Sequence, residues 1–242
     1  MVIFETLFQL PARYVDLLEQ ARKLALACED VAARADEADR FDPDVRERLA
    51  ASGLTRVAVA AEHGGRFEKV DSLAVTVVRE ALAGVSGHLD SMFAMQGIGS
   101  FAVSVAGSPA VQQEWLPKVA TLEAVAAIGL TEPDVGSDLR AITTTVEQDG
   151  DELVLNGHKS FITNAPDADF FGILAKEGDD YSLVLVPAAT RGVTVTTPHQ
   201  IVAPHVLGDV VLEDVRVPLD HRLGERGQGF RLMLATLATF RV

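Results

Sequence analysis

The sequence is poor in cysteine and in basic residues. Its 242 residues contain one cysteine, Cys28, which excludes a disulfide framework and a metal site built from several thiolates. Lysine and arginine number 21 against 35 aspartates and glutamates, giving a formal net charge of −14. Nucleic-acid binding requires a basic surface to neutralise phosphates, so nucleic acid is not an expected partner of this chain.

A signal peptide and a membrane span are also lacking. The short apolar stretch at the N-terminus has no basic residue before it and contains Glu5, which is not the pattern of a secretory signal. The stretch from Ser91 to Gln113 carries no charge, but serines, glycines and Pro109 dilute it. Such a composition favours a buried helix of a globular protein over a membrane span. Together with the single cysteine, these patterns predict a cytoplasmic protein.

The first half of the chain has helical periodicity. Over residues 11–40, apolar residues recur every three or four positions, as they do on the buried face of a helix. A second helix is predicted between Asp42, which is a favourable N-cap, and Gly53. A third covers about residues 72–83, and the uncharged stretch follows it. We therefore predict an all-helical N-terminal domain over residues 1–122.

The second half changes to a period of two, which is typical of β-strands. Two pairs of strands flank short turns that contain Asp-Gly or Glu-Gly-Asp-Asp, and these pairs predict hairpins. The predicted strands cover residues 141–148, 152–156, 169–175, 181–186, 192–196 and 208–217. We expect a small antiparallel β-barrel or sandwich over residues 123–226, so the predicted fold class is α+β.

The last segment, residues 227–242, is predicted to begin a further helical domain. From Phe230 onward, large apolar side chains fall on every side of the predicted helix, and such a helix is buried all round. We interpret this segment as the first helix of a helical bundle, and we expect another part of the protein or another chain to cover it.

The sequence supports neither a dinucleotide-binding site of the Rossmann type nor a histidine metal site. Gly97-Ile-Gly99-Ser-Phe-Ala102 matches a dinucleotide-binding fingerprint, but no strand precedes it and no βαβ unit surrounds it. The histidines have no metal-ligand spacing. His199 and His205 flank a proline-containing loop and are interpreted as loop or pocket residues, so no metal site is predicted.

Two segments are candidate binding sites. In Leu130–Asp138, a proline and a glycine force an irregular backbone beside the hydroxyls of Thr131 and Ser137. Such a loop could hold a planar, heteroatom-rich ring or a carbonyl oxygen, or it could be a capped interdomain turn. Phe161 and Thr163 lie two residues apart and so face the same side of a strand. That pair could stack on and hydrogen-bond to a flat ligand, or it could be ordinary sheet packing.

Three segments together identify a family resemblance. LTEPDVGSD, DGDELVLNGHKSFITNAPDADF and LEDVRVPLDHRLGERGQGF resemble motifs of the acyl-CoA dehydrogenase family, and they occur in that family's order and spacing. The resemblance implies FAD as cofactor and the α,β-dehydrogenation of an acyl thioester carried by CoA or by an acyl-carrier protein. It also implies an oxidoreductase whose electrons pass to an acceptor, for which an electron-accepting flavoprotein is a candidate.

The resemblance assigns roles to single residues. Thr131 and the backbone at Leu130 are expected to bind the pyrimidine edge of FAD, and Thr163 to donate a hydrogen bond near N5. Ser137 matches a serine that touches the acyl thioester or its pantetheine arm. The FAD-binding residues implied in this way are Ile128, Leu130, Thr131, Phe161 and Thr163.

The catalytic base is not found among the residues that match. Full-length members of the family take it, a glutamate, from a second helical domain, and one branch places it at the position of Phe240. We therefore expect no catalytic residue in this chain and a second polypeptide that supplies the helical domain, in a hetero-oligomer. The alternatives are a flavin-dependent oxygenase of the same fold and a non-catalytic thioester-binding or scaffold subunit.

Overall fold

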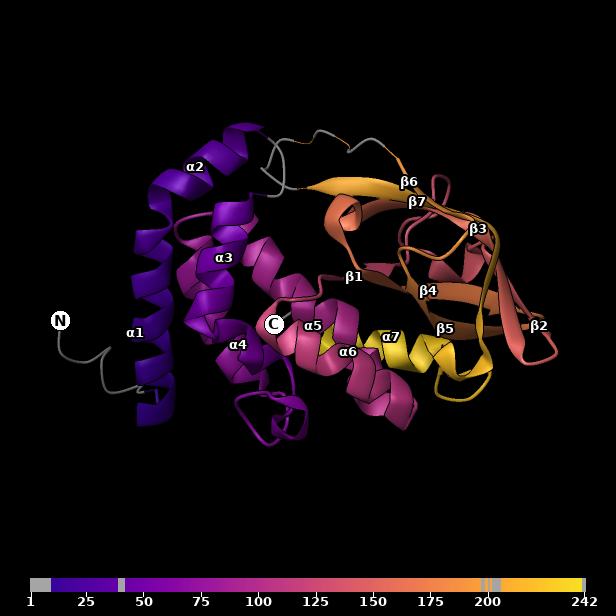
Figure 1. Ribbon diagram of the computed structural model, residues 1–242, viewed down its shortest axis with the longest axis horizontal. Coiled ribbons are helices and arrows are strands. Elements are labelled where there is room, and N and C mark those ends of the chain that lie inside the picture. The colour runs from indigo at the N-terminus through magenta and orange to yellow at the C-terminus, as the bar shows by residue number, and fades with distance from the viewer. Residues whose placement is uncertain (1–9, 39–41, 197–198, 200, 202–205, 241–242) are drawn as a thin grey trace.

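The computed structural model describes residues 10–38, 42–196, 199, 201 and 206–240. A helical part and a β part lie side by side, and three helices occupy the space where they meet (Figure 1). The helices are α1 (Ala12–Ala27), α2 (Glu29–Ala38), α3 (Pro43–Ser52), α4 (Ser72–Ala83), α5 (Gly87–Ala106), α6 (Pro109–Thr121) and α7 (Gly229–Phe240). The strands are β1 (Ala126–Gly129), β2 (Thr145–Asp149), β3 (Glu152–Thr163), β4 (Phe170–Glu177), β5 (Asp180–Pro187), β6 (Val193–Val195), β7 (Leu207–Pro218) and β8 (Arg222–Leu223). The predicted α+β fold class is confirmed.

Capping residues in the sequence correctly predict most helix ends. Asp42 caps α3 by accepting the N–H groups of Asp44 and Val45, and Gly53 ends the helix with a φ of 68°, a left-handed conformation that glycine adopts without strain. The single helix predicted over residues 11–40 is instead two, which meet at Cys28. Cys28 is fully buried, so the bend lets α2 pack against α3 and α5 while the apolar spacing continues.

The strands form one sheet whose order is β6-β7-β3-β2-β4-β5-β8, and β1 pairs with β4. Both predicted hairpins, β2–β3 and β4–β5, are confirmed. Gly150 and Gly178 have φ angles of 63° and 66° in their turns. The prediction of an antiparallel domain misses three features, since β1 and β2 both pair with β4 in parallel and β8 adds a short edge strand.

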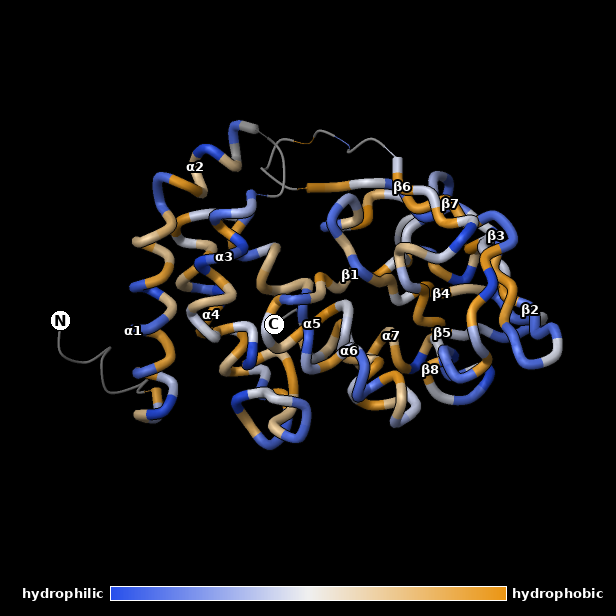
Figure 2. Tube along the Cα trace, in the orientation of Figure 1, coloured by the Kyte–Doolittle hydropathy of each residue, from blue (hydrophilic) through white to orange (hydrophobic). Residues whose placement is uncertain are grey.

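Strand β4 connects two hydrophobic cores because both of its faces are buried. Phe170 and Leu174 pack with residues of α5 and α6, and the rings of Phe170 and Trp115 lie 4.9 Å apart. Phe171 and Ile173, which point to the other face, pack with residues of β3 and β7. The hydropathy colouring shows hydrophobic residues along α5, α7 and the inner strands, whereas the outer hairpin at β2 is hydrophilic (Figure 2).

Helix α5 packs closely against both α7 and β1. A Cβ atom placed on Gly97 would lie 1.9 Å from Cε1 of Phe240 in α7, and one on Gly99 would lie 2.7 Å from Cβ of Ala126 in β1. Both glycines therefore permit close packing, which is the role of the apparent dinucleotide motif in this fold. No helix in the described ranges is long and apolar enough to cross a membrane.

Within the described part of this chain, helix α7 is buried along one side only, so the expectation that another part of the protein or another chain covers it stays a prediction for the other side. Its residues Leu232, Met233 and Phe240 are buried because this chain itself covers them with α5 and β5. Leu234, by contrast, is 56% exposed. The helix thus belongs to the core along one side and faces a hollow along the other, and that hollow is described below.

We expect Gly97→Ala to destabilise the fold. The new methyl group would displace the ring of Phe240, and overpacking of this kind costs about 1–3 kcal/mol, which the better helix propensity of alanine offsets only in part. Urea denaturation measures the change. The control is Gly84→Ala at the end of α4, whose Cβ would meet its nearest atom at 3.4 Å. Equal stability of the two variants would contradict the tight α5–α7 contact.

Candidate functional site

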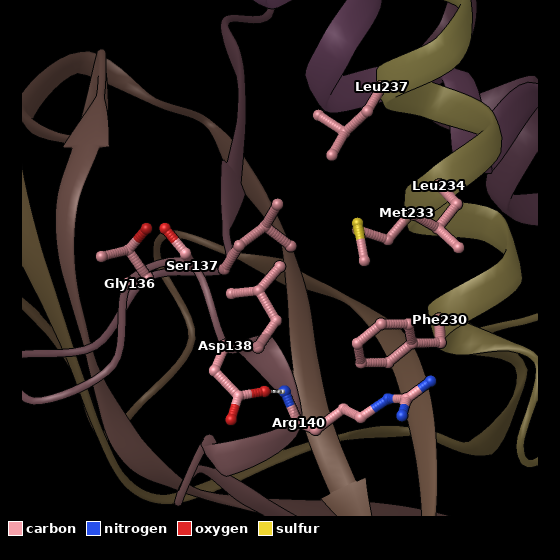
Figure 3. Close-up of a pocket in the computed structure, with 11 residues that line it drawn as sticks. Gly136, Ser137, Asp138, Arg140, Phe230, Met233, Leu234 and Leu237 are labelled. Carbon is pink, nitrogen blue, oxygen red and sulfur yellow. Dashed lines mark hydrogen bonds between the residues drawn. The ribbon is translucent and has the colours of Figure 1, made fainter.

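The candidate site is a pocket of about 680 Å³ between the loop that follows β1 and helix α7. Figure 3 shows Gly136, Ser137, Asp138 and Arg140 along one wall and the apolar residues of α7 along the other. The lining residues are Leu130, Thr131, Gly136, Ser137, Asp138, Leu139, Arg140, Phe230, Met233, Leu234 and Leu237. The structure thus brings together three residues that the sequence singled out, namely Leu130, Thr131 and Ser137.

The pocket loop is fixed by its own hydrogen bonds. Glu132 and Val135 exchange two backbone hydrogen bonds of 2.9 and 3.1 Å, which close a turn around Pro133. The carboxylate of Asp138 accepts the N–H of Arg140 at 3.3 Å (Figure 3). These bonds involve the loop backbone and its acidic side chains. The hydroxyls of Thr131 and Ser137 take part in none of the hydrogen bonds among the described residues. Both hydroxyls therefore remain for a ligand.

A buried ion pair holds this loop to strand β3. Nζ of Lys159 lies 2.8 Å from Oε1 of Glu132, and the two side chains are 0% and 3% exposed. Lys159 also donates to the carbonyl oxygen of Leu130 at 3.2 Å. Glu132 accepts the N–H of Thr143 at 2.6 Å, its hydroxyl at 2.7 Å and the N–H of Thr144 at 3.0 Å. Because nearly every polar atom is partnered, the buried charges are tolerated.

The charge state of the pair follows from these contacts. Burial by itself would raise the pKa of Glu132, but the hydrogen bonds from Lys159, Thr143 and Thr144 outweigh it and lower the pKa to about 2. Burial lowers the pKa of Lys159, and the adjacent carboxylate opposes that decrease. Glu132 is therefore ionised at neutral pH, and its hydrogen bond with Nζ of Lys159 ties the loop to β3.

Gly129 lies beside the stem of Lys159. A Cβ atom on Gly129 would lie 3.1 Å from Cγ of Lys159, so glycine at this position leaves room for the lysine stem. Directly after Lys159, the N–H of Ser160 donates to the carbonyl oxygen of Thr131 at 2.9 Å. This bond places Thr131 beside the strand segment that carries Phe161.

Phe161 occupies a β-bulge. The β3–β7 register shifts between Lys159 and Ile162, and Phe161 has a φ of 57°, which is unusual for a residue with a bulky side chain. Its side chain is 52% exposed and stacks on the ring of His199 at 4.4 Å. Beyond the bulge, Ile162 is buried while Phe161 and Thr163 are not, so both lie on the less buried side of the strand.

The other predicted residues lie apart from the loop pocket. Thr163 lines a second pocket of about 450 Å³ together with residues of α4 and α5. In that pocket, Arg79 holds the carboxylate of Asp90 through hydrogen bonds of 3.0 and 2.9 Å and donates to the carbonyl oxygen of Phe240 at 3.0 Å. Ile128 is half-buried in β1 and lines neither pocket.

The sequence interpretation did not single out Glu132 and Lys159, although both lie in the motifs that it used. Leu153 and Leu155 occupy the inward positions of β3, and the same two-residue period places Lys159 inward as well. A lysine at an inward strand position requires a buried partner, which is the signal that could have identified the pair. Among the described residues, no group of histidine, cysteine, aspartate and glutamate side chains is arranged to hold a metal ion.

We expect Lys159→Met to destabilise the protein by about 3–5 kcal/mol, because it leaves the charge of Glu132 buried without its partner. Adding Glu132→Gln should recover part of this loss, since the buried charge is then gone. The matched control is Lys69→Met, which replaces an exposed lysine. Urea denaturation of the four proteins tests the prediction, and a Lys159→Met variant as stable as the control would refute it.

The pair also predicts a pH dependence. The pKa of Glu132 in the folded protein, about 2, is below its ordinary value of 4.5, so its contribution is complete above pH 4.5 and is lost as pH falls toward 2. That contribution is roughly 3 kcal/mol. We expect stability to fall between about pH 4.5 and about pH 2 more steeply in the wild type than in Glu132→Gln. Parallel acid curves of the two proteins would mean that Glu132 is not the titrating group.

Two family models match this chain. Residues 14–123 match the acyl-CoA dehydrogenase N-terminal domain, and residues 127–215 match the acyl-CoA dehydrogenase middle domain. A curated relative, the cyclohexane-1-carbonyl-CoA dehydrogenase of Syntrophus aciditrophicus, is 30% identical over 232 residues, which cover 91% of this chain and 58% of the relative. The glutaryl-CoA dehydrogenase of Desulfococcus multivorans is 30% identical over 194 residues, 76% of this chain and 50% of that protein.

Solved structures share the fold. A glutaryl-coenzyme A dehydrogenase in complex with glutaryl-CoA has a TM-score of 0.90 at 26% identity, with 97% of this chain and 62% of that chain covered. The butyryl-CoA dehydrogenase of Megasphaera elsdenii has a TM-score of 0.90 at 24% identity and shows the fold alone; 97% of this chain and 64% of that chain are covered. The chain therefore spans about three fifths of the length of such relatives. On the two domain matches and the shared fold, the chain belongs to the acyl-CoA dehydrogenase family.

Proposed function

We propose that this chain forms part of an FAD-dependent acyl-CoA dehydrogenase that introduces an α,β double bond into an acyl thioester. The observation that carries the proposal is the hydrogen bond from Ser160 to Thr131. It joins the loop that bears two hydroxyls without protein partners to the bulge that bears an exposed aromatic ring. The loop and the bulge come from separate motifs, and the fold makes them neighbours.

The residues present fit a flavin. The Thr131 hydroxyl and the backbone at Leu130 offer hydrogen-bonding groups for the polar edge of a planar ring, and Phe161 offers an exposed aromatic surface beside them. Ile128 and Thr163 complete the proposed FAD-binding set. The family supports this assignment, because a glutaryl-CoA dehydrogenase from Mycobacterium smegmatis has been solved in complex with FADH2.

The chain's own residues would bind and orient the reactants. FAD, when bound, supplies the hydride acceptor of the reaction. Ser137 lines the loop pocket and would donate to the thioester or to its pantetheine arm. Phe230, Leu234 and Leu237 form the apolar wall opposite, where they would exclude water from the acyl thioester. A hydrogen bond to the thioester oxygen stabilises the charge that develops there when the α-proton leaves.

We propose that a second polypeptide supplies the base. Two carboxylates line the two pockets in the described part of the chain, and both are engaged: Arg79 binds Asp90 through two hydrogen bonds, and Asp138 caps the backbone of Arg140. The helical domain of such a partner would dock against α7, cover the exposed Leu234 and close the pocket that this residue lines. We further propose that a second flavoprotein accepts the electrons.

Flavin spectroscopy tests the proposal. The chain, alone and together with a partner that carries the helical domain, is incubated with FAD, freed of excess flavin and titrated anaerobically with acyl-CoA thioesters. Bleaching of the bound flavin in the assembled protein supports dehydrogenation. A bound flavin that acyl-CoA does not bleach, but that gives an oxygenated thioester with oxygen after reduction by dithionite, would identify an oxygenase instead. Failure of the assembly to retain flavin would identify a non-catalytic subunit.

We expect Thr163→Val to leave the fold intact but to weaken FAD retention and slow flavin reduction in the assembled protein. The substitution keeps the shape of the side chain and removes one hydroxyl, a loss of about 1 kcal/mol. Thr194→Val, at an exposed threonine of β6, is the matched control. Flavin content and reduction rate equal to those of the control would show that Thr163 does not contact the flavin.

A further inference from the structure

Asp209 lies at the start of β7 and gathers three donors on one carboxylate. Its Oδ2 lies 2.9 Å from Nε2 of His158, and its Oδ1 lies 2.5 Å from Nε2 of His199. The same Oδ1 accepts the backbone N–H of Phe161 at 3.3 Å. The Asp209 side chain is 14% exposed, while those of His158 and His199 are 43% and 35% exposed. The carboxylate is thus shielded by the groups that it binds.

The three contacts converge on the bulge in β3. Lys159 pairs with Val210 and Ile162 pairs with Gly208, so Asp209 is the single residue of β7 that faces Ser160 and Phe161. A bulge of this kind leaves one residue outside the regular ladder and re-aims a side chain. Here the hydrogen bond from the bulged N–H goes to the side chain of Asp209.

The conformation of Phe161 requires such support. A φ of 57° is costly for a residue with a bulky side chain, and the exposed ring gains little from burial. Hydrogen bonding by the carboxylate satisfies its amide, and the stacked ring of His199, tilted by 21°, covers part of its surface. His199 is itself oriented by Asp209, so a single carboxylate controls both contacts.

We propose that Asp209 is a positioning residue: with His158 and His199 it holds Phe161 in the left-handed conformation that presents the aromatic ring to the flavin. This role rests on the proposed function, because it assumes that Phe161 contacts FAD. Hydrogen bonds to Asp209 from both imidazoles and from the Phe161 amide lower the pKa of Asp209 although burial opposes them, so the carboxylate is ionised and accepts all three donors at neutral pH.

The first experiment tests the positioning without any flavin. Selective NMR labels report the amide of Phe161 and the ring protons of His158 and His199. In the wild type, the stacked ring of Phe161 should shift the ring protons of His199 upfield. Asp209→Asn, which keeps the side-chain size but loses the charge and one acceptor oxygen, should move the Phe161 amide signal and abolish that shift. The control is Glu213→Gln, which changes an exposed acid on the same strand.

The second experiment measures FAD itself. We expect Asp209→Asn to weaken FAD binding roughly tenfold, the fold-change that corresponds to the loss of one charge-assisted hydrogen bond. The visible absorption and circular dichroism of the bound flavin should also change, which a general loss of stability would not produce. His158→Gln keeps a side-chain donor and should retain wild-type binding, whereas His158→Ala should not. If Asp209→Asn fails to fold, the two His158 variants decide the matter.

The outcomes separate the two proposals. NMR signals of Asp209→Asn that match the control would overturn the positioning role whether or not the chain binds FAD. Altered NMR signals with an unchanged flavin spectrum and affinity would also overturn it, because Phe161 would then be held by Asp209 but would not act on the flavin. Absence of FAD binding by the wild-type assembly would instead refute the proposed function.

Discussion

The ion pair between Glu132 and Lys159 is the constraint on which the candidate site depends. Two charges without solvent access require partners for nearly every polar atom, and those partners come from the pocket loop, β3 and the segment before β2. The pair consequently fixes the carbonyl of Leu130 and the path of the loop. Gly129 leaves space beside it, since a Cβ atom there would press on Ile173 and on the lysine stem.

The sequence predicts those elements of the fold whose causes are local. The cap at Asp42 and the glycine turns of both hairpins depend on residues within a few positions, and the structure confirms them. The bend at Cys28 depends on what α2 packs against, and the parallel pairing of β1 depends on a strand more than forty residues away. Neither cause is encoded in the periodicity of the segment itself, so the periodicity could not predict either feature.

The candidate site also has features with local causes, which the sequence predicts, and features with distant causes, which it does not. The hydroxyls of Thr131 and Ser137 stand out because an irregular loop of small polar residues is visible in the sequence, and both line the pocket. Strand alternation predicts the side on which Phe161 lies, but its conformation belongs to a bulge in the pairing with β7, where its N–H donates to Asp209. A site that combines hydrogen bonds within a loop and between distant strands is therefore only partly predictable from its motifs.

Helix α7 is apolar on all sides in sequence, and this chain buries one of those sides. Phe240 reaches α5 only because Gly97 has no side chain, and that contact buries one side of the helix. Leu234 and Leu237 on the other side wall the loop pocket, where an apolar surface serves a ligand as well as a protein neighbour. The periodicity of a helix cannot distinguish these two uses of leucine. The opposite wall carries the hydroxyl of Ser137, so the pocket combines an apolar face with a polar group, as small-molecule sites commonly do.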